Sequence, residues 1–273
     1  MKVAAVQLHC SPVQSDNLAR AELAIRSAVE QGADLVVLPE LFASLNRTSI
    51  MRDAAEPLDG PTITWARQIA QTHRCALIAG SFIERHNDRL HNTTVAIDGD
   101  GSIAGTYRKM HLFDVDVDGA ISRESDTFSR GDAPSVVALR VADDTIGQIR
   151  VGLTICYDLR FPELFRAEMN LGADLIVVPA AFTASTGPDH WEVLLRARAI
   201  ENQLMVLAPA QWGTSPDGID RYGHALVIDP WGRVLADAGP EGDSVIVVDF
   251  DTEFQTSVRR RLPAIDHRRT DVY

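Results

Sequence analysis

Cys156 is the residue of this chain best suited to covalent chemistry. It follows the apolar run of residues 151–155 and precedes a polar turn, after which Pro162 opens a predicted helix. A strand that ends in such a turn holds the backbone while the side chain projects beyond the sheet edge, which is a common place for a nucleophile. Most free cysteines, however, are small buried hydrophobes. The position of Cys156 alone leaves both interpretations open.

A cysteine nucleophile needs a base that takes its proton and a donor for the developing oxyanion. No histidine stands in a Cys/His/Asn pattern of the papain kind, so Glu40 is the better candidate base. Glu40 ends an apolar strand, where a carboxylate is costly to desolvate unless it has partners or a task. Lys109 ends a predicted hairpin strand, and its ammonium group near the thiol would lower the thiol pKa and stabilise an oxyanion. Both residues could instead be solvated charges at strand ends.

Two further polar residues are candidates for weaker reasons. Glu124 lies in residues 118–131, a stretch rich in Ser, Asp and Gly that we expect to be a loop, and by itself it would be a surface residue. Arg160 follows Cys156 by four residues and could bind a substrate carboxylate or pair with a neighbouring acid such as Asp158.

The elements that must position these residues alternate between strand and helix patterns. We predict strands at residues 3–8, 34–38 and 76–82, helices at 17–31 and 61–72, and a hairpin formed by residues 93–97 and 102–107. This alternation, with hairpins added, is typical of a layered α/β architecture that contains a mixed sheet.

The second half of the chain repeats the first. Residues 31–42 read QGADLVVLPELF and residues 171–182 read LGADLIVVPAAF, and the hairpin turn at 97–101 recurs at 228–232. Buried strands resemble one another by chance, but two echoes in the same order favour duplication. We therefore predict an α/β fold, a four-layer α-β-β-α sandwich with two stacked mixed sheets and internal pseudo-two-fold symmetry. Glu40 stands where the repeat has Ala180, so the scaffold does not require a carboxylate there.

Bulk properties restrict the class of protein. The chain has 273 residues, which we expect to form one domain over residues 1–273, and its formal net charge of −12 argues against nucleic acid or an anionic membrane as a partner. Its three cysteines form no CxxC pair, a pattern that favours a cytoplasmic protein over a disulfide scaffold or a zinc site. We expect Cys10 and Cys75 to be inert core thiols. No histidine spacing suggests a metal, and no apolar stretch is long enough to span a membrane.

Three motifs together resemble the signature sites of the nitrilase superfamily of carbon–nitrogen hydrolases. They are LPE at residues 38–40, YRK at 107–109 and CYDLRFPE at 156–163. The resemblance covers essentially the whole chain, with the motifs in the family order. It implies the four-layer sandwich described above, a homodimer, a small-molecule amide as substrate, and no cofactor or metal.

The resemblance also implies a role for each matching residue. Glu40 would be the general base, Lys109 the oxyanion stabiliser and Cys156 the nucleophile, and a further catalytic glutamate falls on Glu124. The backbone N–H of Tyr157 would complete the oxyanion hole.

Within the superfamily the chain is most similar to the Nit-type amidases. Residues 186–201, 222–225 and 229–232 resemble deaminated glutathione amidase, whereas residues 109–119 followed by Glu124 are also close to omega-amidase. The resemblance implies hydrolysis of a small carboxylate-bearing amide to an acid plus ammonia through a cysteine thioester, with Arg160 as a candidate substrate anchor. Deaminated glutathione amidase is the main prediction and omega-amidase the alternative. A non-catalytic binding module on the same fold is the third hypothesis.

Overall fold

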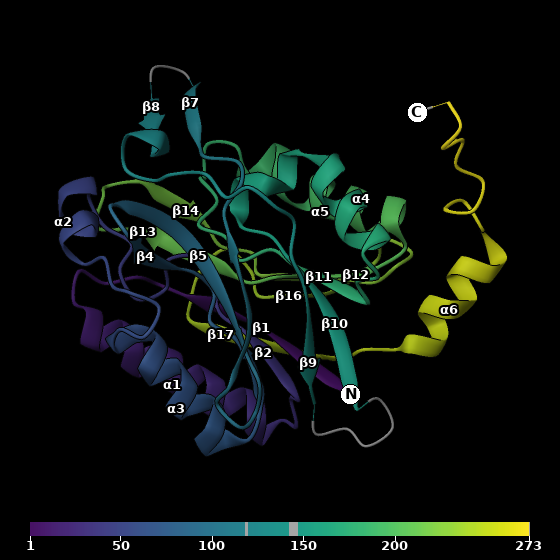
Figure 1. Cartoon of the computed structure of the whole chain (residues 1–273), viewed down its shortest axis with the longest axis horizontal. Helices are drawn as coiled ribbons and strands as arrows, with labels where there is room; N and C mark the ends of the chain where they lie inside the picture. Colours follow the sequence, from purple (N-terminus) through teal and green to yellow (C-terminus); the bar gives the residue numbers. More distant parts are fainter. Residues whose placement is uncertain (118–119, 142–146, 273) are drawn as a thin grey trace.

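Two β-sheets packed face to face form the centre of the computed structural model, which describes residues 1–117, 120–141 and 147–272 (Figure 1). One sheet contains six strands of the first half, β1 (Lys2–Leu8), β2 (Leu35–Val37), β3 (Ala76–Ile78), β4 (Phe82–His86), β5 (Arg89–Ile97) and β6 (Ile103–Arg108), and β17 (Ser244–Asp249) from the second half. We call it the first sheet. The other contains β9 (Val136–Arg140), β10 (Gln148–Leu153), β11 (Leu175–Val177), β12 (Met205–Ala208), β15 (Leu226–Ile228) and β16 (Val234–Asp237).

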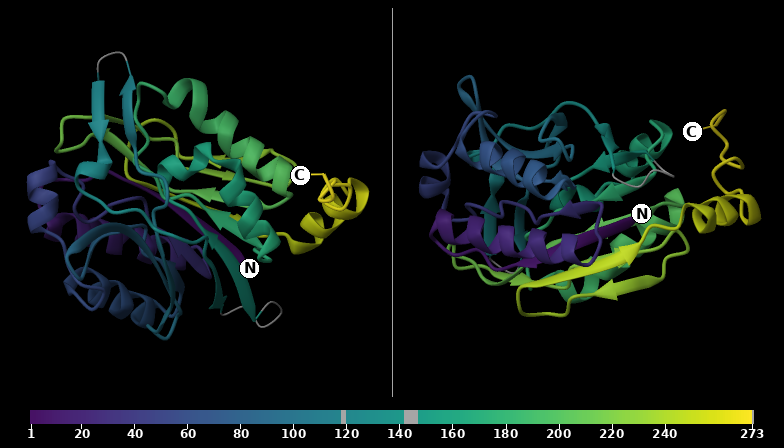
Figure 2. Two further views of the ribbon diagram at one scale, coloured as in Figure 1. Left: turned by 45° about the horizontal axis from the view of Figure 1, so that its top comes forward. Right: turned by 90° about the horizontal axis from the view of Figure 1, so that it is seen from below.

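Helices cover the outer face of each sheet. On one side lie α1 (Gln14–Glu30) and α3 (Pro61–His73), and on the other lie α4 (Pro162–Asn170) and α5 (Gly187–Asn202) (Figures 1 and 2). The alternation of β1 explains these layers, because successive side chains of a strand point to opposite faces. Val3 and Ala5 pack against the second sheet, whereas Ala4 and Val6 pack against the helices. The predicted four-layer sandwich is confirmed.

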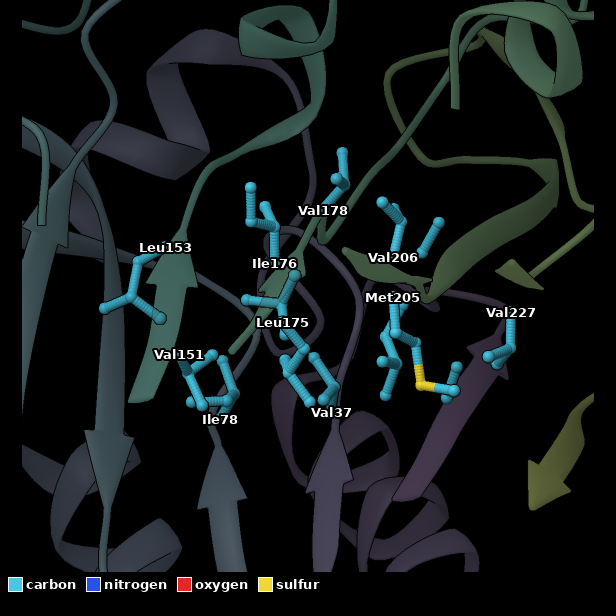
Figure 3. Packing of buried hydrophobic residues seen from close by; sticks show 14 of the residues in the cluster. Val37, Ile78, Val151, Leu153, Leu175, Ile176, Val178, Met205, Val206 and Val227 are labelled. Atoms are coloured by element: carbon cyan, nitrogen blue, oxygen red, sulfur yellow. The ribbon is translucent and has the colours of Figure 1, made fainter. Parts of the chain in front are cut away.

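The core between the sheets consists of aliphatic side chains from both halves. Val37 and Ile78 from the first sheet lie close to Val151 and Leu175 from the second (Figure 3). Since all four are fully buried, their burial holds the carboxyl ends of β2 and β10 at a constant separation.

Matching strand order and direction confirm the predicted pseudo-two-fold symmetry. The order β17-β1-β2-β3-β5-β6 in one sheet corresponds to β9-β10-β11-β12-β15-β16 in the other. In both sheets the successive pairs are antiparallel, parallel, parallel, antiparallel and antiparallel. The last pair of each also carries a register shift, at Ala96/Ile97 and at Val227/Ile228.

The hairpin of β13 (Ala210–Thr214) and β14 (Asp220–Tyr222) joins the halves. It leaves the second half of the chain and pairs in parallel with β1 of the first sheet, with Gln7 opposite Ala210. Outside the layers lie α2 (Thr48–Asp53), the hairpin of β7 (Asp114–Val117) and β8 (Ala120–Arg123), and α6 (Thr252–Arg261), which projects from the body (Figure 1).

Two predicted elements differ from the structure. The strand expected over residues 76–82 ends at Ile78, because Gly80 adopts a φ of +49° and passes so close to Pro39 that a Cβ atom there would lie 2.0 Å from the Pro39 carbonyl oxygen. The loop expected over 118–131 contains β8 and a short 3₁₀-helix, η1 (Glu124–Asp126); residues 118–119 lie outside the described residues. Within the described ranges, no helix is long and apolar enough to cross a membrane.

Candidate active site

A cavity of about 370 Å³ brings all the predicted site residues together. Its walls include Glu40, Lys109, Glu124, Tyr157 and Arg160, together with Cys156. Glu40 follows β2, and Cys156 follows β10, so the site lies beyond the carboxyl ends of one strand from each sheet.

The backbone at Cys156 adopts an unusual conformation. Its φ of +45° is uncommon for a residue other than glycine and persists only where the surroundings hold it. The Cys156 N–H donates to the carbonyl oxygen of Pro179 at 2.9 Å, and the Asp158 N–H donates to that of Ile155 at 3.0 Å. Cys156 thereby opens the 3₁₀-helix η2 (Cys156–Arg160), and α4 begins at Pro162 as predicted.

One buried ammonium group joins the two glutamates. Lys109 Nζ lies 2.9 Å from Glu40 Oε1 and 3.0 Å from Glu124 Oε1, and Lys109 is only 2% exposed. The second oxygen of each carboxylate accepts a backbone hydrogen bond, Glu40 Oε2 from Ala181 N–H at 2.9 Å and Glu124 Oε2 from Phe113 N–H at 2.6 Å. Glu124 Oε2 also lies 2.9 Å from Lys109 Nζ. Both carboxylates are thus fixed in orientation.

The charge states follow from these contacts. Burial alone would raise the pKa of Glu40, but the charge and hydrogen bond of Lys109 hold that pKa below its ordinary value. Burial opposes the charge of Lys109, yet Glu124 and Glu40 raise its pKa well above the usual value. Burial, and then the charge of Glu40, raise the pKa of Cys156 well above that of a free thiol. The resting site therefore holds a neutral thiol and an ionised carboxylate on the wall of one cavity.

Asn92 belongs to this network, and the sequence did not indicate it. Its Nδ2 donates to Glu40 Oε1 at 2.9 Å and to Glu124 Oε1 at 3.2 Å, and its backbone carbonyl oxygen accepts the backbone N–H of Lys109 at 2.9 Å. The predicted strand began one residue later, at 93. A polar side chain next to an apolar strand was the available signal.

Arg160 does not pair with Asp158, which was one of its two predicted partners. Its Nη1 lies 3.2 Å from Nδ1 of His190, and its guanidinium carbon lies 5.4 Å from the ring centre of Phe182 and 5.7 Å from that of Tyr157. The carboxylate of Asp158 instead binds Tyr107 and His111. The guanidinium group of Arg160 therefore lines the cavity beside the aromatic rings of Phe182 and Tyr157.

The other two cysteines lie apart from this cavity. Cys10 and Cys75 are 1% and 2% exposed, and burial raises the pKa of each to about 11. Both are buried thiols, as predicted. In the described part of the chain, no three His, Cys, Asp or Glu side chains are grouped so that they could hold a metal ion.

Comparisons with known proteins agree with this geometry. A family model described as carbon-nitrogen hydrolase matches residues 2–260. The chain is 39% identical to omega-amidase NIT2 of Mus musculus, covering 100% of this chain and 96% of that protein. It is 41% identical to deaminated glutathione amidase of Synechocystis sp., covering 97% of each chain.

Solved structures are similar over the same length. Saccharomyces cerevisiae Nit3, a member of branch 10 of the nitrilase superfamily, superposes with a TM-score of 0.86 and 33% identity, over 98% of this chain and 96% of that chain. A mutant amidase from Nesterenkonia sp. AN1 superposes with a TM-score of 0.82 and 27% identity, over 100% of this chain and 95% of that chain. That amidase carries the acetamide moiety of fluoroacetamide covalently attached at its active site cysteine.

Proposed function

The chain belongs to the carbon–nitrogen hydrolase family, and from that premise we propose that it is an amidase that hydrolyses a small carboxylate-bearing amide through a thioester on Cys156. One observation carries the proposal. Cys156 and Glu40 line the same cavity, and Glu40 Oε1 lies 2.9 Å from Nζ of Lys109, which lines it as well. A nucleophile, a base and a cation thus meet in one cavity.

In the acylation step, Glu40 accepts the Cys156 proton while the sulfur attacks the amide carbon. Because the thiol pKa is raised, proton transfer accompanies attack and no free thiolate accumulates. Lys109 Nζ and the backbone N–H of Tyr157 stabilise the oxyanion. The C–N bond then breaks, and Glu40 returns its proton to the leaving nitrogen.

In the deacylation step, water cleaves the thioester. Glu40 takes a proton from the water as the oxygen attacks the acyl carbon, and the proton passes to the departing sulfur of Cys156. Glu124 holds the second side of Lys109, so the lysine keeps its charge while Glu40 gains and loses a proton. The products are a carboxylic acid and the amine or ammonia released earlier.

The charges on the cavity wall favour an anionic substrate. The charge of Lys109 is offset by two glutamates, which leave one excess negative charge, and the charge of Arg221 is offset by Asp217. The remaining cationic wall residues form no ion pair with an acid in the described part of the chain; they are Arg47, Arg123 and Arg160. A carboxylate-bearing amide would therefore be attracted into the cavity although the chain as a whole carries a formal charge of −12.

Deaminated glutathione amidase is the main proposal and omega-amidase the alternative. A second hollow of about 430 Å³ has Asn46 and Arg47 in its lining, as the catalytic cavity does, so a long, peptide-like leaving group that extended past these two residues would reach it. Ammonia is the product only for a primary amide such as 2-oxoglutaramate. Glutathione contains peptide-type amides, so its deaminated form would release an amine.

The deciding experiment compares kcat/KM for deaminated glutathione and for 2-oxoglutaramate, with both ammonia and primary amine quantified. We expect amine release from the first substrate with the higher kcat/KM. A higher kcat/KM for 2-oxoglutaramate would favour the omega-amidase alternative instead.

Arg160→Ala tests the substrate anchor. We expect KM for an anionic amide to rise by about tenfold, the loss of one charged hydrogen bond, with a much smaller change for a neutral amide of the same size. Arg160→Lys, which keeps the charge, serves as the matched control. Equal effects of Arg160→Ala on both amides would remove Arg160 as the anchor.

Selective labelling separates the enzyme from a non-catalytic binding module. An iodoacetamide label on Cys156, with Cys10 and Cys75 protected by burial, supports the enzyme. Equal slow labelling of all three cysteines would favour a binding module.

We also propose that residues 1–273 act as one cytoplasmic domain that forms a homodimer. The single domain is supported by β17 and β13, two strands of the second half that pair with β1 of the first half. The dimer is supported by exposed apolar side chains on and beside α5, namely Val193, Ile200 and Trp231. Light scattering of the purified protein tests the dimer, and cell fractionation tests the compartment.

A further inference from the structure

We propose that Asp158 is a positioning residue that holds the turn of Cys156 and the segment of Lys109 in one fixed arrangement. The proposal rests on the function proposed above and adds a residue outside the cavity wall. Asp158 has no exposed surface and is not among the residues that line the cavity. Its carboxylate nevertheless accepts four hydrogen bonds from two chain segments that meet only in the folded protein.

The first segment is the turn that carries the nucleophile. Asp158 Oδ2 accepts the N–H of Ile155 at 2.9 Å, immediately before Cys156. The positive φ of Cys156 is strained for a residue other than glycine and survives only where neighbouring bonds enforce it. The Ile155 bond to Asp158 and the Cys156 bond to Pro179 act on consecutive peptide groups and supply that enforcement.

The second segment is the one that carries Lys109. Asp158 Oδ2 also accepts the Tyr107 hydroxyl at 2.8 Å, while Oδ1 accepts the His111 N–H at 3.1 Å and lies 2.7 Å from His111 Nδ1. The Tyr107 oxygen in turn accepts the N–H of Met110 at 3.2 Å. These hydrogen bonds link the residues on both sides of Lys109 to Asp158, which lies two positions after Cys156.

A carboxyl group offers an acceptor oxygen to each of the two backbone donors, whereas an amide in its place offers only one. Each oxygen meets one backbone N–H, that of Ile155 on one side and that of His111 on the other, and a backbone N–H cannot become an acceptor. An asparagine at position 158 would direct its NH₂ group at one of these N–H groups in either orientation. The conservative change Asp158→Asn therefore breaks the link between the segments while keeping the side-chain size.

The experiment compares Asp158→Asn with Glu168→Gln. Glu168 is also fully buried and makes none of these four hydrogen bonds, and burial together with the charge of Asp158 raises its pKa, so it is a matched control in the same region. We expect Asp158→Asn to lower kcat about 100-fold with KM within about threefold of the wild type, as for a small misplacement of reacting groups. The control should keep both values within about threefold of the wild type.

Two further measurements keep the proposal testable. The rate of Cys156 alkylation by iodoacetamide needs no substrate, and we expect Asp158→Asn to change it at least about tenfold through displacement of the thiol. His111→Asn can replace the Nδ1 donor, whereas His111→Leu cannot. We therefore expect the first to keep most of the activity and the second to lose about 20-fold.

A folded Asp158→Asn protein with kcat and alkylation rate within threefold of the wild type would overturn the proposal. If that variant does not fold, equal losses in His111→Asn and His111→Leu would overturn it. A wild-type protein that hydrolyses no amide would contradict the proposed function instead, and the alkylation rates would still decide the role of Asp158.

Discussion

The two halves of the molecule end equivalent strands in different ways. β2 is followed by Glu40, a carboxylate bound to Lys109 and Asn92, whereas β11 is followed by Ala180, which is fully buried. The next residue in the second half, Ala181, contributes a backbone N–H that donates to Glu40 Oε2 at 2.9 Å. One half thus supplies the charged side chain and the other supplies a backbone donor to it.

This difference shows what the duplicated scaffold provides. Both halves share strand order, direction and the final register shift, so the symmetry specifies backbone positions. The chemistry arises where single side chains depart from the symmetry, at Glu40 in one half and at Cys156 in the other. Pseudo-symmetry brings two strand ends together, and asymmetry gives them complementary functions.

The largest expected effect comes from removing the side chain that the second half contributes. Cys156→Ala should lower amide hydrolysis by at least about 10⁴-fold and leave the melting temperature nearly unchanged, because no other cysteine lines the cavity in the described residues. Cys75→Ala, at a buried cysteine of the first half, should keep its activity. Product release by Cys156→Ala above one part in a thousand of the wild-type rate would contradict the nucleophile assignment.

Removing the charge that the first half contributes should have the next largest effect. Glu40→Gln keeps the side-chain size and loses the base, so we expect kcat to fall by about 10³-fold. Steady-state kinetics on the substrate with the higher kcat/KM measures it. A loss of tenfold or less would mean that another group takes the Cys156 proton.

Asn92→Leu should have a smaller effect, because it removes a neutral bridge between the two carboxylates and keeps the lysine. We expect kcat to fall by about 10- to 100-fold through misorientation of Glu40 and Glu124. The matched control is Thr94→Val, on the same strand, whose hydroxyl donates to the Gly80 carbonyl and not to the active site. Equal activity losses in the two variants would show that Asn92 acts only through stability.

A glutamate placed at position 180, the equivalent of Glu40 in the second half, tests the comparison by protein stability instead of activity. Ala180→Glu would bury a carboxylate in the apolar cluster to which Ala180 belongs, so we expect the free energy of unfolding to fall by about 3 kcal/mol or more. Urea denaturation measures the change, with Ala180→Val as a control for added size. Similar losses in both variants would mean that volume, and not charge, limits this position.

Much of the fold was predictable because its signals are local. The alternation of β1, the apolar run of β2 and the Pro that opens α4 each depend on a few adjacent residues. The break at Gly80 was not predictable, since it depends on the close approach of Pro39, which is distant in sequence. The hairpin of β7 and β8 was missed because each strand has only four residues and β8 lies in the stretch rich in Ser, Asp and Gly that was interpreted as a loop.

The sequence by itself determined which residue types follow which strands, and it named Glu40, Lys109, Glu124 and Cys156 through their motifs. Only the tertiary structure decided that these side chains meet, because Lys109 and Asn92 both bind Glu40, which precedes them in the chain by 69 and 52 positions. It also assigned Asp158 to Tyr107 and His111, and Arg160 to the cavity wall. The physical reason is that residue patterns predict local backbone structure, whereas charge states and partners depend on burial and on contacts between distant segments.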